Sequence, residues 1–133
     1  MTMMVRGIRG ATTVESNSRE EILEATRELL SAIVEANAID HDHVASIIFT
    51  TTVDLNAEFP AVAAREDGWT DVALQCMHDM NVPGSLSRCI RILMHVNTER
   101  ANSELQHIYL RGAKRLRADL VERQEAAAGG SGS

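Results

Sequence analysis

The stretch CIRILMHVN, residues 89–97, alternates strictly between two kinds of side chain. Successive side chains of a β-strand point to opposite faces, so the alternation predicts a strand with two unlike faces. One face is wholly aliphatic and consists of Ile90, Ile92, Met94 and Val96. The other consists of Cys89, Arg91, Leu93 and His95. The aliphatic face requires cover from another layer of the fold, so Arg91 is expected to point away from that layer.

A second strand is predicted near the N-terminus, where residues 4–15 read MVRGIRGATTVE. Arg6 and Arg9 stand three positions apart, so they point to opposite faces and at most one of them can enter a given site. Gly7 and Gly10 let the backbone pass close to a neighbour or a ligand, and an arginine beside them offers a planar fork that fits a carboxylate. The run is therefore a candidate anion-binding strand.

A long amphipathic helix is predicted after this strand. Ser18 followed by Glu21 has the pattern of a capping box that opens a helix. Apolar residues then recur at spacings of three and four, at Ile22, Ala25, Leu29, Ile33 and Ala36. This spacing predicts one helix of about five turns that packs on a sheet and turns its acidic residues to water.

The rest of the chain alternates between predicted strands and helices. A β-branched run at residues 44–52 predicts a buried strand. Residues 56–65 predict a second helix, with Pro60 in its first turn and Asp67-Gly68 at its end. Three shorter segments are predicted as well, namely strands at 72–75 and 106–110 and a helical stretch through Leu120.

Together these elements predict an α+β fold, in which one mixed sheet of about five strands packs with two main helices. Helices on one face leave the other face of the sheet without cover, and further copies of the same chain are the simplest cover. Residues 1–125 are expected to form a single domain, because a chain of 133 residues can bury one core. Residues 126–133, AAAGGSGS, are typical of a flexible added tail.

Composition limits the partners and the location of the chain. The formal net charge of −6 disfavours nucleic acid and anionic membranes, because both bind basic surfaces. No apolar run approaches the ~20 residues of a membrane span and no signal peptide is visible, so a cytoplasmic protein is expected. Cys76 and Cys89 form no CxxC pair, which favours free thiols. The Asp-His-Asp-His run at residues 40–43 has no distant third ligand, so a solvated turn is expected rather than a metal site.

Four segments together resemble one known family. The run at residues 4–15, CMHDM at 76–80, CIRIL at 89–93 and HIYL at 107–110 occur in the order, and near the spacing, of the monofunctional chorismate mutases of the trimeric α/β-barrel type. The resemblance spans residues 4–120 and implies a homotrimeric pseudo-α/β-barrel with active sites at subunit interfaces. It also implies a cofactor-free isomerase, which rearranges chorismate to prephenate in the shikimate-pathway branch that leads to phenylalanine and tyrosine.

The resemblance implies a role for particular residues. Arg9 and Tyr109 match positions that hold the enolpyruvyl carboxylate of the substrate, and Arg91 matches the arginine at its ether oxygen. Cys76 matches a position that lines the pocket near the substrate hydroxyl. Further substrate contacts are implied for the pocket-wall positions Phe59 and Ala61, for Arg65 near the ring carboxylate and for Arg117 in the C-terminal segment. A Claisen rearrangement needs no nucleophile or metal, only restraint of the reactive conformer and positive charge at the ether oxygen.

The chain departs from the family pattern at Asp79, where the family usually has a glutamate that accepts a hydrogen bond from the ring hydroxyl. Aspartate is one methylene shorter, so its carboxylate falls short unless the backbone moves or a water bridges the gap. A lost charged hydrogen bond costs about 1.5 to 3 kcal/mol, or on the order of 10- to 150-fold in rate. Val62 stands where some relatives have lysine, and the loop at Asp67 is one residue shorter. A working but slower enzyme is therefore predicted.

Two other functions stay open for this fold. One is a trimer without catalytic activity that binds an anionic metabolite, with Asp79 as the mark of a decayed site. The other is the chemistry of the enamine/imine deaminase group, which has a similar trimeric architecture and also holds a carboxylate with arginine. A fold alone does not separate such functions.

Overall fold

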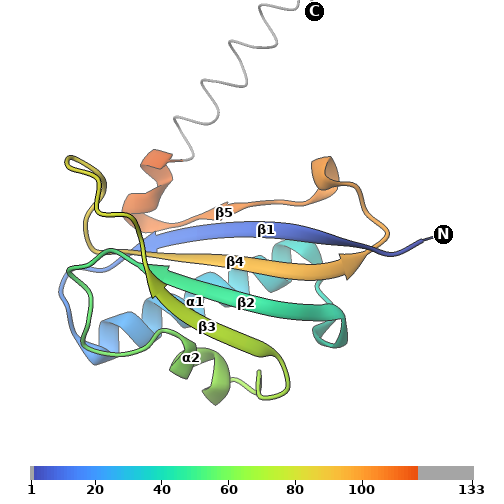
Figure 1. The fold of residues 1–133 in the computed structure, drawn as a ribbon, viewed down its shortest axis with the longest axis horizontal. Helices are drawn as coiled ribbons and strands as arrows, with labels where there is room; N and C mark the ends of the chain where they lie inside the picture. The colour runs from blue at the N-terminus through green and yellow to red at the C-terminus, as the bar shows by residue number, and fades with distance from the viewer. Residues whose placement is uncertain (1, 117–133) are drawn as a thin grey trace, which may run out of the picture.

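The computed structural model describes residues 2–116, which form one mixed five-stranded sheet with helices on one of its faces (Figure 1). In chain order the strands and helices are β1 (Met4–Thr13), α1 (Arg19–Asn37), β2 (Val44–Thr51), α2 (Ala61–Glu66), β3 (Ala73–His78), β4 (Cys89–Thr98) and β5 (Ile108–Tyr109). The strand order across the sheet is β3-β2-β4-β1-β5. β4 runs antiparallel to β1 and β2, whereas β3 is parallel to β2 and β5 is parallel to β1. The α+β prediction is confirmed.

The strict alternation of residues 89–97 becomes the central strand β4. Ile90, Ile92 and Met94 are at most 1% exposed, because they face the helices. Arg91 and Leu93 lie on the opposite face and are only half-buried. We call this opposite face of the sheet the open face, because α1 and α2 both lie on the other side (Figure 1). A short 3₁₀ turn, Arg111–Ala113, packs against one end of it. The prediction that Arg91 points away from the covering layer is confirmed.

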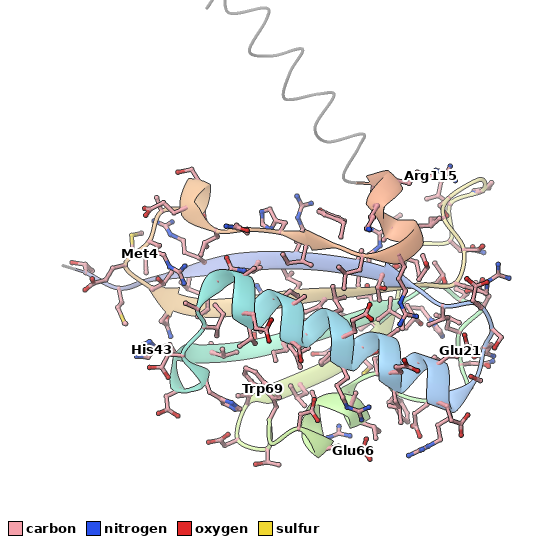
Figure 2. The ribbon with its side chains drawn as sticks, turned by 180° about the vertical axis from the view of Figure 1, so that it is seen from behind. Met4, Glu21, His43, Glu66, Trp69 and Arg115 are labelled. Carbon is pink, nitrogen blue, oxygen red and sulfur yellow. The ribbon has the colours of Figure 1, made fainter. Side chains whose placement is uncertain are left out.

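Helix α1 supplies most of the cover for the other face (Figure 2). The Ser18 hydroxyl accepts the N–H of Glu21 at 3.2 Å, as the capping box predicts. The predicted apolar stripe is buried except at its last residue, because Ala36 is exposed and Asn37 takes the inward position. Asn37 is satisfied there, since its side chain donates to the carbonyl of Gln106 at 2.9 Å and accepts the Gln106 N–H at 2.7 Å.

Helix α2 is shorter than the sequence predicts. It begins at Ala61 with Pro60 as its N-cap, so residues 56–59 are not helical. The reason is the proline ring, which disfavours helical backbone at the preceding residue, Phe59. The Asn17 side chain instead holds this segment, because its oxygen accepts the N–H of Asn56 and of Ala57, both at 3.0 Å.

The edge strands also differ from their predicted ranges. β3 continues through Cys76 to His78, since each residue from Ala73 to His78 has a partner in β2. β5 contains only two residues and pairs with β1 at Gly10 and Ala11. The predicted buried strand at 44–52 is buried at alternate positions only, because its other side chains lie on the open face.

The described helices are all short or amphipathic. None of those within residues 2–116 is long and apolar enough to cross a membrane.

Candidate active site

The open face carries a cavity of about 290 Å³ that is lined by residues of all five strands. We call it the arginine cavity, and its lining includes Arg9, Ala11, Arg91 and Tyr109. Strand register brings these residues together. Ala11 pairs with Arg91 across β1 and β4 and with Tyr109 across β1 and β5, and Arg9 lies two positions before Ala11 on the same face. Three of the predicted site residues therefore share one cavity.

Arg9 is fixed in this cavity through its backbone. Its N–H donates to Nδ1 of His107 at 2.9 Å, which ties β1 to the residue that precedes β5. Burial, together with the charge of Arg9, lowers the pKa of His107 below its usual 6.5. A neutral imidazole is the form that this contact requires, because Nδ1 must keep its lone pair to accept the N–H.

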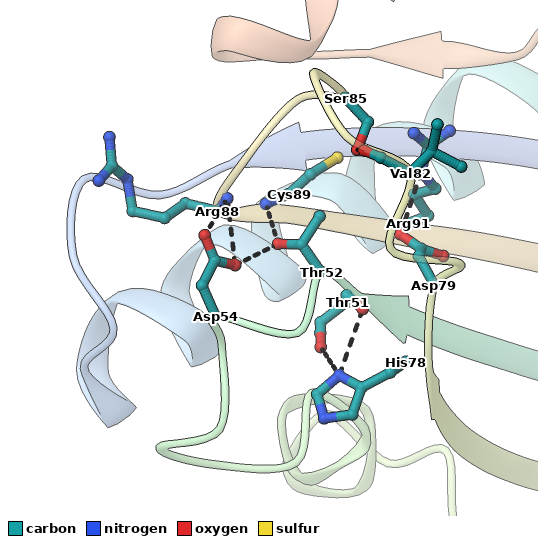
Figure 3. A network of polar contacts seen from close by, with 10 residues as sticks. All are labelled: Thr51, Thr52, Asp54, His78, Asp79, Val82, Ser85, Arg88, Cys89 and Arg91. Atoms are coloured by element: carbon teal, nitrogen blue, oxygen red, sulfur yellow. Dashed lines mark hydrogen bonds and ion pairs between the residues drawn. The ribbon is translucent and has the colours of Figure 1, made fainter.

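Asp79 lies beside Arg91, with its Oδ2 at 3.3 Å from Nε of the guanidinium (Figure 3). This separation is that of an ion pair, but Oδ2 is buried and has no hydrogen-bond partner among residues 2–116. The two groups are therefore close enough to form an ion pair, but their atoms are not aligned for a hydrogen bond. One oxygen of Asp79 is thus buried against Arg91 without a hydrogen bond among the described residues.

A second cavity, of about 420 Å³, lies at the free edge of β3. We call it the edge cavity, and its lining includes Phe59, Cys76, Met77 and His78. Phe59 is 66% exposed in the single chain, which is unusual for a large aromatic side chain. His78 is held at the rim, because its Nδ1 lies 3.1 Å from the hydroxyl of Thr51.

Cys76 connects the edge cavity to helix α2. Burial raises the pKa of the Cys76 thiol, and the Ala61 backbone and the charge of Arg65 offset this only in part. The thiol is therefore neutral at physiological pH, which suits a wall residue and not a nucleophile. Ala61 is itself 1% exposed and packs in the core beneath this cavity, while Arg65 is exposed on α2.

Cys89, the other free thiol, begins β4 near the arginine cavity. Its burial raises the pKa to about 11, so this sulfur is also unreactive at physiological pH. It packs with Ala11, Tyr109 and Ala113 and supports the arginine cavity from the side.

The predicted site residues thus fall into two groups in one chain. Arg9, Arg91 and Tyr109 line the arginine cavity, and Phe59 and Cys76 line the edge cavity. Asp79 pairs with Arg91 but lines a third cavity, of about 240 Å³, together with the residues that follow it. Arg117 lies outside the described residues. The sequence interpretation gave no site role to the other lining residues of the arginine cavity, which include Ile48, Thr50 and Met77. Alternation along β2 would have found two of them, had that strand been taken as half-buried.

The fold and the cavity define a class of protein, and comparisons with known proteins show the family. The class is an α+β protein with helices on one face of a mixed sheet and an arginine-lined cavity on the other. A family model described as chorismate mutase type I matches residues 5–120. The chain belongs to this family.

Individual relatives agree with the family match. The chorismate mutase AroH of Bacillus subtilis (strain 168) is 46% identical over 119 residues, which are 89% of this chain and 94% of that protein. The chorismate mutase AroH of Thermus thermophilus is 50% identical over 122 residues, which are 91% and 100% of the two chains. A solved chorismate mutase from Clostridium thermocellum is 52% identical, with a TM-score of 0.81 over 82% of this chain and 97% of that one.

Proposed function

We propose that this protein is a chorismate mutase that converts chorismate to prephenate in the cytoplasm, in the route to phenylalanine and tyrosine. The observation that carries the proposal is the joint placement of Arg9, Arg91 and Tyr109 around the arginine cavity. Membership of the type I family and near 50% identity to named chorismate mutases support it further. A pocket with two arginines also suits a dianionic substrate.

The reaction is a Claisen rearrangement, in which the ether C–O bond breaks as a C–C bond forms in the same molecule. Arg9 and Tyr109 hold the enolpyruvyl carboxylate and so keep the substrate in its compact reactive conformer. Arg91 places its guanidinium where the ether oxygen gains negative charge as the bond breaks. No nucleophile, proton transfer or cofactor is required, and the neutral thiols of Cys76 and Cys89 are consistent with this.

Asp79 contributes the negative side of the site. We assign to its carboxylate the hydrogen bond from the ring hydroxyl of chorismate. The same carboxylate faces the positive charge that develops on the ring. Because it also lies 3.3 Å from Arg91, it holds that guanidinium on the open face before substrate arrives.

The complete site, in this proposal, forms between subunits of a homotrimer. The edge cavity of one subunit supplies Phe59 and Cys76, with Ala61 and Arg65 behind them, and the neighbour supplies the arginine cavity and Asp79. Arg117 is assigned to the same site. Two observations support this arrangement: the two groups line different cavities within one chain, and the open face leaves Ile48, Leu93 and Met77 partly exposed.

Two measurements test the proposal. The purified protein is incubated with chorismate after dialysis against a chelator, and the product is identified by NMR. Prephenate formation at an unchanged rate supports a cofactor-free mutase, whereas no product would favour an anion-binding or deaminase function. Light scattering tests the assembly, with an expected mass three times the 14.6 kDa of the chain.

A further inference from the structure

The loop that carries Asp79 is tied at both of its ends to one short turn (Figure 3). We call residues 79–88 the acidic loop, after Asp79 at its start, and residues 51–54 the anchor turn. At the start of the loop, the N–H of Asp79 donates to the carbonyl of Thr51 at 2.7 Å. At its end, the N–H of Arg88 donates to Asp54, at 3.0 Å from Oδ2 and 3.3 Å from Oδ1. Both contacts therefore depend on the same four residues.

The anchor turn is itself held together by Thr52. The Thr52 hydroxyl donates to Asp54 Oδ1 at 2.5 Å and accepts the N–H of Cys89 at 3.0 Å. Its backbone N–H donates to the carbonyl of Cys89, also at 3.0 Å. Although partial burial of the carboxyl acts in the opposite sense, these bonds from Thr52 and the Arg88 amide lower the pKa of Asp54. Asp54 is therefore a charged acceptor at neutral pH, which makes each bond stronger.

Asp54 secures a residue with an unfavourable backbone. Arg88 has a φ of 46°, in the left-handed region that residues other than glycine rarely adopt. Such a conformation persists only where its surroundings fix it. Asp54 holds the N–H of Arg88, and the N–H of Val14 donates to its carbonyl at 3.0 Å. Without Asp54, the backbone of Arg88 loses one of these two hydrogen bonds.

Side-chain packing holds the acidic loop at Leu86, which is partly buried and packs against the cluster of Ala11, Cys89, Tyr109 and Ala113. A cavity of about 240 Å³ separates the loop from the anchor turn. Earlier in the loop the large apolar side chains are exposed, with Met80 87% exposed and Val82 55% exposed. Within residues 2–116, the loop is therefore held by the polar contacts of the anchor turn together with the packing of Leu86.

The two members of the charge pair differ in how firmly they are held. Arg91 sits in the centre of the sheet, paired with Ala11 on one side and Thr50 on the other. Asp79 follows the last residue of the edge strand β3, and its backbone is held by the bond of its N–H to Thr51. A shift of the acidic loop would therefore move Asp79 more than Arg91.

We propose that Asp54 is a positioning residue, which sets the separation of Asp79 from Arg91 through the acidic loop. This inference rests on the proposed chorismate mutase function, because its main test is a rate. Asp54 does not touch the substrate in this account. It acts by keeping the carboxylate of Asp79 within reach of both the guanidinium and the substrate hydroxyl.

The test combines substitutions at Asp54 and Asp79. Asp54→Ala is expected to lower kcat about 10- to 100-fold, because small displacements of catalytic groups carry costs of this size. Asp54→Asn keeps an acceptor for Arg88 and should stay within about fivefold of wild type. In an Asp79→Asn background, Asp54→Ala should change kcat/KM by less than about threefold, because the group it positions is already impaired.

A matched control uses another aspartate that accepts a backbone amide. Asp40 accepts the N–H of Asp42 at 3.0 Å in an exposed turn far along the chain from the acidic loop. Asp40→Ala should leave kcat within about twofold of wild type. If Asp54→Ala does not fold, Thr52→Val replaces it, because that change removes the hydroxyl between Asp54 and Cys89.

Three outcomes decide the inference. Full additivity of Asp54→Ala and Asp79→Asn would overturn it, and so would an unchanged kcat in Asp54→Ala.

A second readout, amide hydrogen exchange, is independent of activity. Faster exchange at Asp79, Arg88 and Cys89 in Asp54→Ala, with none at Ile92, supports the restraint even if wild type does not turn over chorismate. In that case the proposed function fails, but the role of the anchor turn does not. Unchanged exchange at these amides would overturn the inference, because the loop would then not depend on Asp54.

Discussion

The resemblance to the family implies a glutamate at the position of Asp79, so this residue tests the effect of shortening a side chain by one methylene. We expect Asp79→Glu to raise kcat on the order of 10-fold or more, because a longer carboxylate restores a direct charged hydrogen bond to the ring hydroxyl. Steady-state rates at saturating chorismate measure the effect. A lower kcat would mean that the pocket has adapted to aspartate, as the 3.3 Å pairing with Arg91 allows.

At the level of single residues, the sequence predicted the face of the sheet on which the arginines lie better than it predicted their contacts. Alternation along residues 89–97 placed Arg91 on the open face, and the spacing of Arg6 and Arg9 put only one of them there. The contact of Arg9 with His107 could not be predicted, because it joins residues 98 positions apart through the register of a two-residue strand. The contacts of the anchor turn with the acidic loop were missed because they also join residues that are distant in the sequence.

Among the secondary-structure elements, the edge strand β5 depends on a neutral histidine, His107. Because the pKa of His107 is lowered on folding, the unfolded chain binds a proton more readily as the pH falls below about 6.5. We expect the free energy of unfolding to decrease from that pH down to the lowered pKa, where protonation breaks the bond to the Arg9 amide.

Urea unfolding at about pH 7.5, 6.5 and 5.5 measures this dependence, since the range spans ordinary histidine titration. The control is His107→Gln, which removes the titrating group and should show a flatter profile. An equal slope in the variant would show that other groups govern stability in this range.

The packing of α1 on β1 depends on the absence of a side chain at Gly10. A Cβ there would lie 2.8 Å from Cδ1 of Ile33 and 3.0 Å from Cδ1 of Leu29, both in the buried core. We expect Gly10→Ala to destabilise the fold by about 1–3 kcal/mol, because a packed core cannot absorb an added methyl without strain. Denaturant unfolding at neutral pH measures it.

A second substitution shows whether that strain has the stated source. Ile33→Val removes the clashing Cδ1 and alone should cost about 0.5–1.5 kcal/mol. Combined with Gly10→Ala, it should cost less than the sum of the two single changes, because the valine makes room for the new Cβ. Simple additivity would contradict the packing explanation.

Local sequence signals predicted the long elements and missed the ends of short ones. The capping box at Ser18 and the three-and-four spacing gave α1 almost completely, since local hydrogen bonds and one buried stripe determine it. Helix α2 and strands β3 and β5 gave no such signal. Their ends depend on Pro60, on pairing with β2 and on two residues of β1, which a periodic pattern does not show.

At the scale of the whole molecule, the proposed trimer makes each active site a joint product of two subunits. We expect Arg91→Ala and Phe59→Asp each to lose activity alone, because each damages one of the two halves. Co-expression of the two variants should restore it, because a mixed ring contains one junction with two intact halves. For random mixing, about a quarter of all sites would recover.

The measurement is chorismate turnover per subunit in the co-expressed sample, with the two separately expressed variants as controls. No recovery in a trimer of confirmed mass would show that the two cavities do not form one site. The sequence alone could not decide this point, because the residues of both cavities come from one chain and only assembly would join them.

The most direct test of the central claim compares kcat and KM for chorismate in wild type, Arg91→Ala and Arg91→Lys. If Arg91 stabilises the ether oxygen in the transition state, the alanine variant should lose at least about 100-fold in kcat with a smaller change in KM. Lysine should recover little of this loss, because it lacks the planar fork of arginine. A wild-type enzyme that forms prephenate, with an alanine variant that is equally active, would contradict the role assigned to Arg91.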